Sequence, residues 1–212
     1  YYTGLRTVGE DLRKVRPTWM ASAPRLWEGL YQRILQNVAG APILRRALFR
    51  AAYHCSQKFQ GARFYLAGMQ MDVEGRTWSQ SLRLALRSLA CMLLYALPHA
   101  VLDRLVLQKL RGVVGGSFRG TVSGGGALPP HVDEFFNYIG IPVLEGYGMT
   151  ETSPVLAVRT GRKLVIGTVG PLWPHTEVRI VEPGTGNVIY PSRLQPGGGR
   201  GRKGEIHARG PQ

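Results

Sequence analysis

The sequence contains few cysteines and no pattern that would bind a structural zinc ion. Cys55 and Cys91 are the two cysteines in 212 residues. They are too few for a disulfide framework, and a reducing compartment is the default for such a chain. Cysteine and histidine do not occur at zinc-ligand spacing. Disulfide-stapled and zinc-stapled domains are therefore excluded as fold classes.

A long uncharged apolar run is also missing. None reaches the roughly 18 residues of a membrane-spanning helix, and the nearest candidate, Ser88 to Leu102, is interrupted by Pro98. The first residues lack the basic region and apolar core of a signal peptide. Because the chain begins without methionine and ends in mid-pattern, we interpret it as an internal piece of a longer protein.

Acidic residues are scarce relative to basic ones. There are 13 Asp and Glu against 27 Lys and Arg, which gives a formal net charge of +14. Such a charge fits nucleic acid, an anionic membrane surface or an anionic ligand. The basic residues are mostly arginine scattered along the chain, whereas a nucleic-acid binder would cluster them with exposed aromatic residues. We therefore expect no nucleic-acid partner.

The first half of the sequence contains apolar residues at helical spacing. Apolar residues from Trp27 to Val38 recur at the spacing of one helix face, and residues 43–60 read as a second, arginine-rich helix. A third stripe is flanked by Arg83 and Arg87. That helix could lie on a membrane surface, but amphipathic helices more often cover a core, and we favour core packing. The stripe consists of Leu82, Leu86, Leu89, Leu93 and Leu97.

The character changes near residue 112, where a strand, a glycine loop, a helix and a second strand follow one another. The strand is expected at Phe118 to Ser123, the loop at Gly124 to Gly126, and the second strand at Pro142 to Leu144. A helical crossover normally makes such strands parallel. The glycine loop and the loop from Gly146 to Glu151 should then meet at one edge of the sheet, where open α/β sheets bind ligands.

The remainder reads as mostly β. A strand is expected at Thr176 to Val181, its hairpin partner at Val188 to Tyr190, and a last strand at Glu205 to Arg209, after a basic loop from Pro196 to Gly204. We therefore divide the chain into an α/β part, residues 1–154, with a helix-rich insertion at 43–115, and a β-rich part, residues 155–212.

The two loops carry residues suited to a nucleotide with a metal. Gly146 and Gly148 let backbone approach a ligand closely, and Tyr147 offers an aromatic face to a flat ring. Thr150 offers a hydroxyl to phosphate, and Glu151 is a hard oxygen ligand for Mg²⁺ shared with phosphates. The alternative is that the glycines only make turns and that Tyr147 packs in the core.

The stretch SGGGALPPHVDEFFNYIGIPVLEGYGMTETSPV (Ser123 to Val155) resembles the central signature of the adenylate-forming superfamily. The flanking segments, Arg16 to Ile34, Val165 to Ile180 and Gly204 to Gln212, resemble the long-chain fatty acyl-CoA synthetases within it. The resemblance implies part of the large N-terminal domain of such an enzyme. We expect an α/β fold with a helical layer and a mostly parallel sheet, followed by a β-rich, barrel-like segment.

The resemblance also implies a reaction and a set of roles. ATP and a fatty acid give an acyl-adenylate, and coenzyme A then displaces AMP to form a thioester; Mg²⁺ assists the first step. Thr150 would touch phosphate and Glu151 would hold Mg²⁺. The nucleotide and acyl side of the site would be lined by Gly125, Gly126, Ala127, Glu145, Gly146, Tyr147, Gly148 and Met149.

Other parts of the family pattern are missing. We find no phosphate loop ending in lysine, no ribose-binding Asp and no C-terminal catalytic lysine, and Lys203 does not match the context of that lysine. We therefore expect the chain alone to be inactive. The alternatives are a noncatalytic nucleotide-binding or interaction module, or a ligase for another acid or for a carrier protein. We expect a cytoplasmic protein, with peripheral contact to the inner membrane surface left open.

Overall fold

The structure, a computed structural model, describes residues 7–73, 75–190 and 201–210. Its first sheet has the order β1-β2-β3-β4. β1 (Trp19–Ser22), β2 (Gly120–Ser123) and β3 (Val143–Gly148) are parallel, and β4 (Val155–Val158) is antiparallel to β3. The mostly parallel sheet expected from the sequence is therefore present. β4, at the proposed division near residue 155, belongs to this first sheet.

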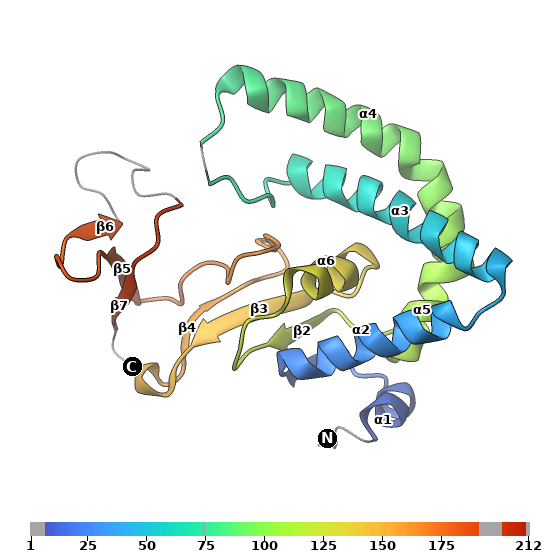
Figure 1. Cartoon of the computed structure of the whole chain (residues 1–212), viewed down its shortest axis with the longest axis horizontal. Helices are drawn as coiled ribbons and strands as arrows, with labels where there is room; N and C mark the ends of the chain where they lie inside the picture. Colours follow the sequence, from blue (N-terminus) through green and yellow to red (C-terminus); the bar gives the residue numbers. More distant parts are fainter. Residues whose placement is uncertain (1–6, 74, 191–200, 211–212) are drawn as a thin grey trace.

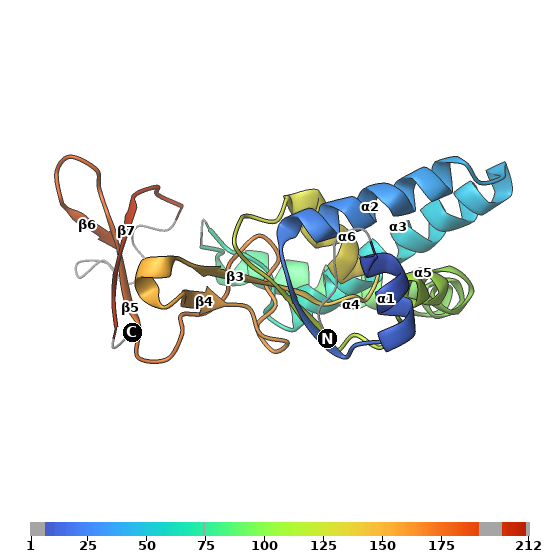
Figure 2. The same ribbon diagram turned by 90° about the horizontal axis from the view of Figure 1, so that it is seen from below.

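Two helices cover one side of the sheet and build the core with it (Figures 1 and 2). α2 (Pro24–Ala39) and α6 (Pro130–Tyr138) each begin with proline, which needs no hydrogen-bond partner at that position. Trp27 of α2 is fully buried and meets Phe136 of α6 edge to face at 4.9 Å between ring centroids. α1 (Val8–Val15) adds Val8 and Leu12 to the same core.

A long helical hairpin extends from this core. α3 (Ile43–Leu66) and α4 (Trp78–Leu102) lie side by side (Figure 1). α4 begins at a capping box, in which Thr77 and Gln80 exchange hydrogen bonds. After α4 the helix continues through a π-helical turn, η1 (Asp103–Leu107), into α5 (Gln108–Val113). These helices occupy the helix-rich region expected at 43–115.

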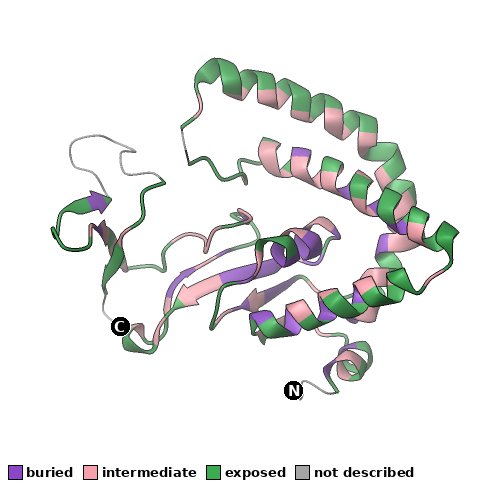
Figure 3. Ribbon diagram, viewed as in Figure 1, coloured by how far each residue is buried: buried purple, intermediate pink, exposed green. Residues whose placement is uncertain are grey.

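The leucine stripe of α4 does not pack on a core, so that expectation is wrong. Tyr65 donates from its hydroxyl to the Ser81 carbonyl, and Phe59 stacks on His99, so α3 takes the opposite face of α4. No third layer covers the outer face among the described residues, and no residue of α4 is buried (Figure 3). The five stripe leucines are 44–75% exposed.

The helix from residue 78 to residue 113 is long and apolar enough to cross a membrane, judged by length and composition within the described part of the chain. Its most apolar window has a mean hydropathy of 1.5, and none of that window is buried. Core helices of soluble proteins pass the same test of composition, but they are mostly buried. The burial of this helix therefore differs from that of a core helix.

The chain ends in a second, antiparallel sheet of order β6-β5-β7 (Figure 1). β5 (Glu177–Val181) pairs with β6 (Val188–Tyr190) as the expected hairpin and with β7 (Glu205–Arg209) on its other side. The expected basic loop, Pro196 to Gly204, lies partly outside the described residues. β-rich structure in this region is therefore confirmed.

Candidate functional site

The two glycine-bearing segments lie side by side at the carboxyl edge of the first sheet. Ser123 at the end of β2 is in register with Glu145 of β3. A Cβ atom placed on Gly124 would be 3.7 Å from the carbonyl oxygen of Gly146. The proximity predicted from two parallel strands is confirmed, although the segments are about 20 residues apart in sequence.

The glycine loop after β2 has an open outer side. Gly125 has φ +80°, a left-handed conformation that favours glycine, and no heavy atom lies within 4 Å of the position that a Cβ atom would take there. Gly125, Gly126 and Ala127 are all exposed. The loop can therefore present backbone to a ligand without side chains in the way.

Gly146, Tyr147 and Gly148 belong to β3, which corrects the prediction that they form a loop. Strand β4 pairs antiparallel with this part of β3, so the extended conformation continues beyond the parallel region. Gly148 lies at a register shift, and a side chain there would overlap the carbonyl oxygen of Pro154. The chain reverses only after Gly148, which places the half-buried Tyr147 on a strand next to the glycine loop.

The reversal is a single 3-10 turn, η2 (Thr150–Thr152). The Thr152 hydroxyl donates to the carbonyl oxygens of Met149 and Pro154 at 3.0 and 3.1 Å, which fixes the shape of the turn. Thr150 and Glu151 are exposed, and Met149 is half-buried. Their exposure leaves a hydroxyl and a carboxylate accessible beside the end of β3.

The donor set at this turn fits a metal shared with a ligand. No group of three or more His, Cys, Asp or Glu side chains in the described ranges could enclose an ion. Glu151 supplies one accessible carboxylate. Mg²⁺ is commonly held by one or two carboxylates together with substrate phosphates and water, so Glu151 is suited to that arrangement.

Glu145 turns its carboxylate into the protein. Oε1 accepts a hydrogen bond from the Leu128 amide at 3.0 Å, and Oε2 accepts one from Nη2 of Arg159 at 2.9 Å. The Arg159 guanidinium is fully buried and also donates from Nη1 to Asp133 at 2.7 Å. This network ties β3, α6 and the segment after the glycine loop to one another.

The sequence reasoning missed Asp133 and Arg159. Asp133 is 1% exposed; it also accepts hydrogen bonds from the side chain of Asn137 at 2.8 Å and the amide of Gly167 at 3.1 Å. Arg159 also donates from Nε to the carbonyl of Thr168. The available signals were an acid on the apolar face of a helix and an arginine directly after the apolar strand Val155–Val158.

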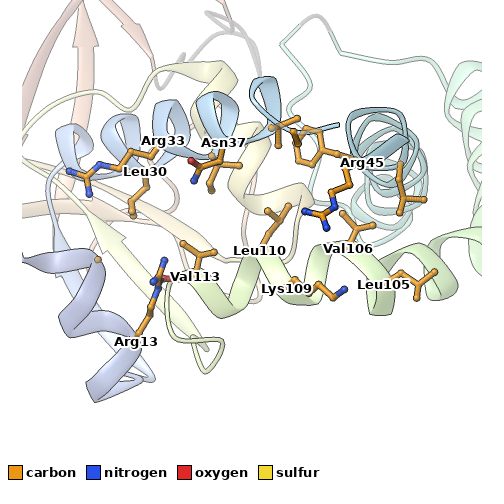
Figure 4. A pocket seen from close by; sticks show the side chains of 16 residues that line it. Arg13, Leu30, Arg33, Asn37, Arg45, Leu105, Val106, Lys109, Leu110 and Val113 are labelled. Atoms are coloured by element: carbon orange, nitrogen blue, oxygen red, sulfur yellow. Dashed lines mark hydrogen bonds between the residues drawn. The ribbon is translucent and has the colours of Figure 1, made fainter. Parts of the chain in front are cut away.

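A separate cavity of about 660 Å³ lies among α1, α2, α3, η1 and α5 (Figure 4). None of the predicted site residues lines it. Pro24 at the start of α2 lies next to the glycine loop, since a Cβ atom placed on Gly126 would be 3.8 Å from its Cγ. The cavity is lined instead by the part of α2 from Leu30 onward.

The similarity to known proteins includes the residues of this site. The family described as AMP-binding enzyme matches residues 5–212. A chloroplastic long-chain-fatty-acid–[acyl-carrier-protein] ligase of Arabidopsis thaliana is 34% identical over 215 residues, covering 100% of this chain and 28% of that protein. A long-chain-fatty-acid–CoA ligase of Mycobacterium tuberculosis is 34% identical over 179 residues, covering 82% of this chain and 26% of that protein.

Among solved structures, a long-chain-fatty-acid-CoA ligase from Archaeoglobus fulgidus aligns with a TM-score of 0.48 and 12% identity. The alignment covers 99% of this chain and 28% of that one. The chain thus spans little more than a quarter of the length of these proteins.

Proposed function

The chain belongs to the AMP-binding enzyme family, and we propose that the protein containing it is a long-chain fatty acid–CoA ligase. The observation that carries this proposal is the contact of the two glycine-bearing segments, with Gly124 next to Gly146 at the edge of a parallel sheet. The names of the relatives support a long-chain acid as substrate.

The reaction proceeds in two balanced steps. A carboxylate oxygen of the acid attacks the α-phosphorus of ATP, the bond to the bridging oxygen breaks, and pyrophosphate leaves. The thiol sulfur of the acceptor then attacks the acyl carbon, the thiol proton is released, and AMP leaves. Negative charge grows on phosphate oxygens in the first step, so donors and a metal placed there contribute most to the rate.

The described residues have distinct proposed roles in the first step. Gly125, Gly126 and Ala127 form an open backbone wall, and Tyr147 lies against the adenine ring. Thr150 donates to a phosphate oxygen, and Glu151 holds Mg²⁺, which neutralises phosphate charge when bound. Gly148 and Met149 lie beside the acyl carboxylate.

Glu145 has a different proposed role from the one expected from the sequence. Its carboxylate is buried and already accepts hydrogen bonds from Leu128 and Arg159. We therefore assign it as a positioning residue that holds the glycine loop against β3, and contact with adenine falls to Gly146 and Tyr147.

The acceptor is proposed to be coenzyme A, with an acyl carrier protein as the alternative that the Arabidopsis relative favours. The test uses the complete polypeptide that carries these residues, with palmitate, ATP and Mg²⁺. ATP–pyrophosphate exchange that depends on palmitate supports adenylate formation, and its absence contradicts it. Thioester formation with coenzyme A or with the phosphopantetheine-bearing carrier protein then identifies the acceptor.

The 212-residue chain alone is proposed to be inactive, because the phosphate loop, ribose-binding Asp and C-terminal lysine of the family pattern do not occur in it. Pyrophosphate exchange by this chain alone would contradict that proposal. A noncatalytic module is the alternative for the complete protein, and it predicts nucleotide binding without exchange in the test above.

We propose further that the protein is cytoplasmic and contacts an anionic bilayer through α4. The outward leucines are exposed, and Arg83 and Arg87 lie beside them on the same exposed part of the helix. α3 and α4 contain no acidic residue. Apolar side chains flanked by cations suit the interface of a membrane that carries anionic lipids.

A further inference from the structure

The cavity beside α2 has an apolar interior. Its 660 Å³ lies within the usual range for small-molecule sites, about 300–1,000 Å³. The walls come from segments far apart in sequence, so the tertiary fold creates the space. The main apolar contributors are Leu30, Ile34, Val38, Phe49, Val106 and Leu110.

Four cationic side chains surround this apolar space, one from each of four helices. They are Arg13 of α1, Arg33 of α2, Arg45 of α3 and Lys109 of α5. All four are exposed, and none forms an ion pair within the ranges that the structure describes. Figure 4 shows Arg13 and Arg45 extending toward the cavity from different helices. No Asp or Glu lines the cavity in the described part of the chain.

The cavity is distinct from the glycine-loop site. Both sites touch α2, but Pro24 at its first turn lies next to the loop, whereas the helix lines the cavity only from Leu30 onward. Six helical residues at 1.5 Å each separate Pro24 from Leu30 by about 9 Å. No residue assigned to the adenylate lines the cavity, so a ligand in the cavity would be held by a different set of side chains.

An apolar interior with a cationic rim complements a molecule that has an apolar chain and an anionic head. Inorganic phosphate or a nucleotide would leave the apolar walls unused, and a neutral lipid would leave the cations unused. We propose that the cavity binds a single-chain amphiphile with a carboxylate or phosphate head group. The chain lies among α1, α2, α3 and α5, and the head lies between Arg45 and Lys109. This inference does not rest on the proposed reaction.

The test measures binding to the 212-residue chain by isothermal titration calorimetry below the micelle concentration of each probe. The probes are palmitate, palmitoyl lysophosphatidate, the neutral monopalmitoylglycerol and inorganic phosphate. Both anionic amphiphiles, or one of them, should bind at least about tenfold more tightly than the neutral lipid, and inorganic phosphate should not bind. Binding of palmitate alone identifies fatty acids as the source of the ligand, and binding of lysophosphatidate alone identifies phospholipids.

Two variants locate the site. Arg45→Gln/Lys109→Gln should weaken binding by about fivefold or more, since two charge contacts are lost. Ala41→Phe, which adds a ring at the half-buried edge of the cavity, should weaken it as well. The matched control, Arg63→Gln/Arg162→Gln, removes two exposed charges outside the cavity and should bind as the parent chain does. Circular dichroism verifies that each variant is folded.

Three results would overturn the proposal. The first is no binding of either anionic amphiphile by a folded chain. The second is equal affinity for the neutral lipid, and the third is unchanged affinity in both cavity variants. Because none of these measurements uses ATP or turnover, failure here is distinguishable from failure of the proposed ligase activity.

Discussion

The guanidinium of Arg159 donates to the carboxylate of Glu145 at 2.9 Å, with the arginine fully buried and the glutamate nearly so. The two residues lie on adjacent segments of the sheet, and the other Glu145 oxygen holds the amide of Leu128. The shape of the glycine loop therefore depends on an ion pair beneath it.

Removal of one partner of this pair should destabilise the protein strongly. Arg159→Leu leaves the carboxylates of Glu145 and Asp133 buried without their cation, and such a loss typically costs about 3–5 kcal/mol. The matched control is Arg202→Leu, because Arg202 pairs with Glu182 at the surface, 3.2 Å away. The control should lower the free energy of unfolding by less than about 1 kcal/mol. Urea denaturation measures both, and similar losses would contradict the assigned importance of burial.

Glu151 should affect catalysis far more than stability. Its side chain is exposed, so Glu151→Ala should change the free energy of unfolding by less than about 0.5 kcal/mol. Palmitate-dependent pyrophosphate exchange by the complete polypeptide should fall by about 100-fold and need more Mg²⁺. Glu177→Ala removes another exposed carboxylate as a control. An unchanged magnesium requirement in Glu151→Ala would remove the metal role from this residue.

The glycines of the site should differ in their tolerance of alanine. Gly148→Ala places a methyl group on the Pro154 carbonyl and should destabilise by more than about 2 kcal/mol. Gly125→Ala meets open space but strains a left-handed residue, which costs about 1–2 kcal/mol. Gly161→Ala, with neither problem, is the control. Thermal denaturation gives the order, and a Gly148 variant as stable as the control would exclude the overlap.

The ion pair of Asp103 and Arg111 should produce a pH-dependent stability. Arg111 donates to both carboxylate oxygens at 2.7 Å, and these hydrogen bonds lower the pKa of Asp103. Because the folded-state pKa is depressed, the stabilisation is present above the ordinary value of 3.8 and is lost as the pH falls through the lower, folded-state value. Asp103→Asn should therefore cost about 1 kcal/mol at pH 7, and the difference from the parent should shrink below about pH 4.

Urea denaturation from pH 7 to pH 2.5 tests this relationship. Glu182→Gln, which weakens a more exposed pair, serves as the control and should show a smaller difference at pH 7. A difference between Asp103→Asn and the parent that grows as the pH falls would have the wrong sign.

The outer face of α4 should determine membrane binding. Leu86→Glu/Leu93→Glu places two anions on this face and should abolish sedimentation with vesicles that contain anionic lipid. Leu172→Glu/Val188→Glu makes the same charge change at exposed apolar residues outside α4 and should still sediment. If the parent chain sedimented equally with neutral vesicles and with anionic vesicles, this result would contradict a role for Arg83 and Arg87. Self-association without vesicle binding would assign the face to a second copy of the chain.

Local patterns in the sequence predicted the elements that surround the site. The Gly124 to Gly126 turn and the prolines at the start of α6 indicate a helical crossover between two strands, and such a connection normally makes the strands parallel. β1 was not predicted, since four residues with alternating exposure give almost no periodic signal. The extension of β3 through Gly148 depends on pairing with β4, which local residue preferences do not contain.

Interactions between distant residues were less accessible to prediction. Asp133 and Arg159 meet across 26 residues only after α6 packs on the sheet, and the local sequence around either residue does not identify its partner. The α4 stripe has the same pattern whether or not a third layer covers it. Its exposure follows from the arrangement of neighbouring elements and not from the helix itself.

The π-helical turn at Asp103–Leu107 lets one continuous helix change which of its sides faces the core. Leu107 follows Leu82 by 25 residues, so an unbroken α-helix would bring it back to within about 20° of the outward direction of Leu82. Leu107 is nevertheless fully buried. The extra residue in the wide turn supplies the rotation, so an unbroken α-helical hydrogen-bond pattern through η1, with all its residues kept, would turn this side chain toward solvent.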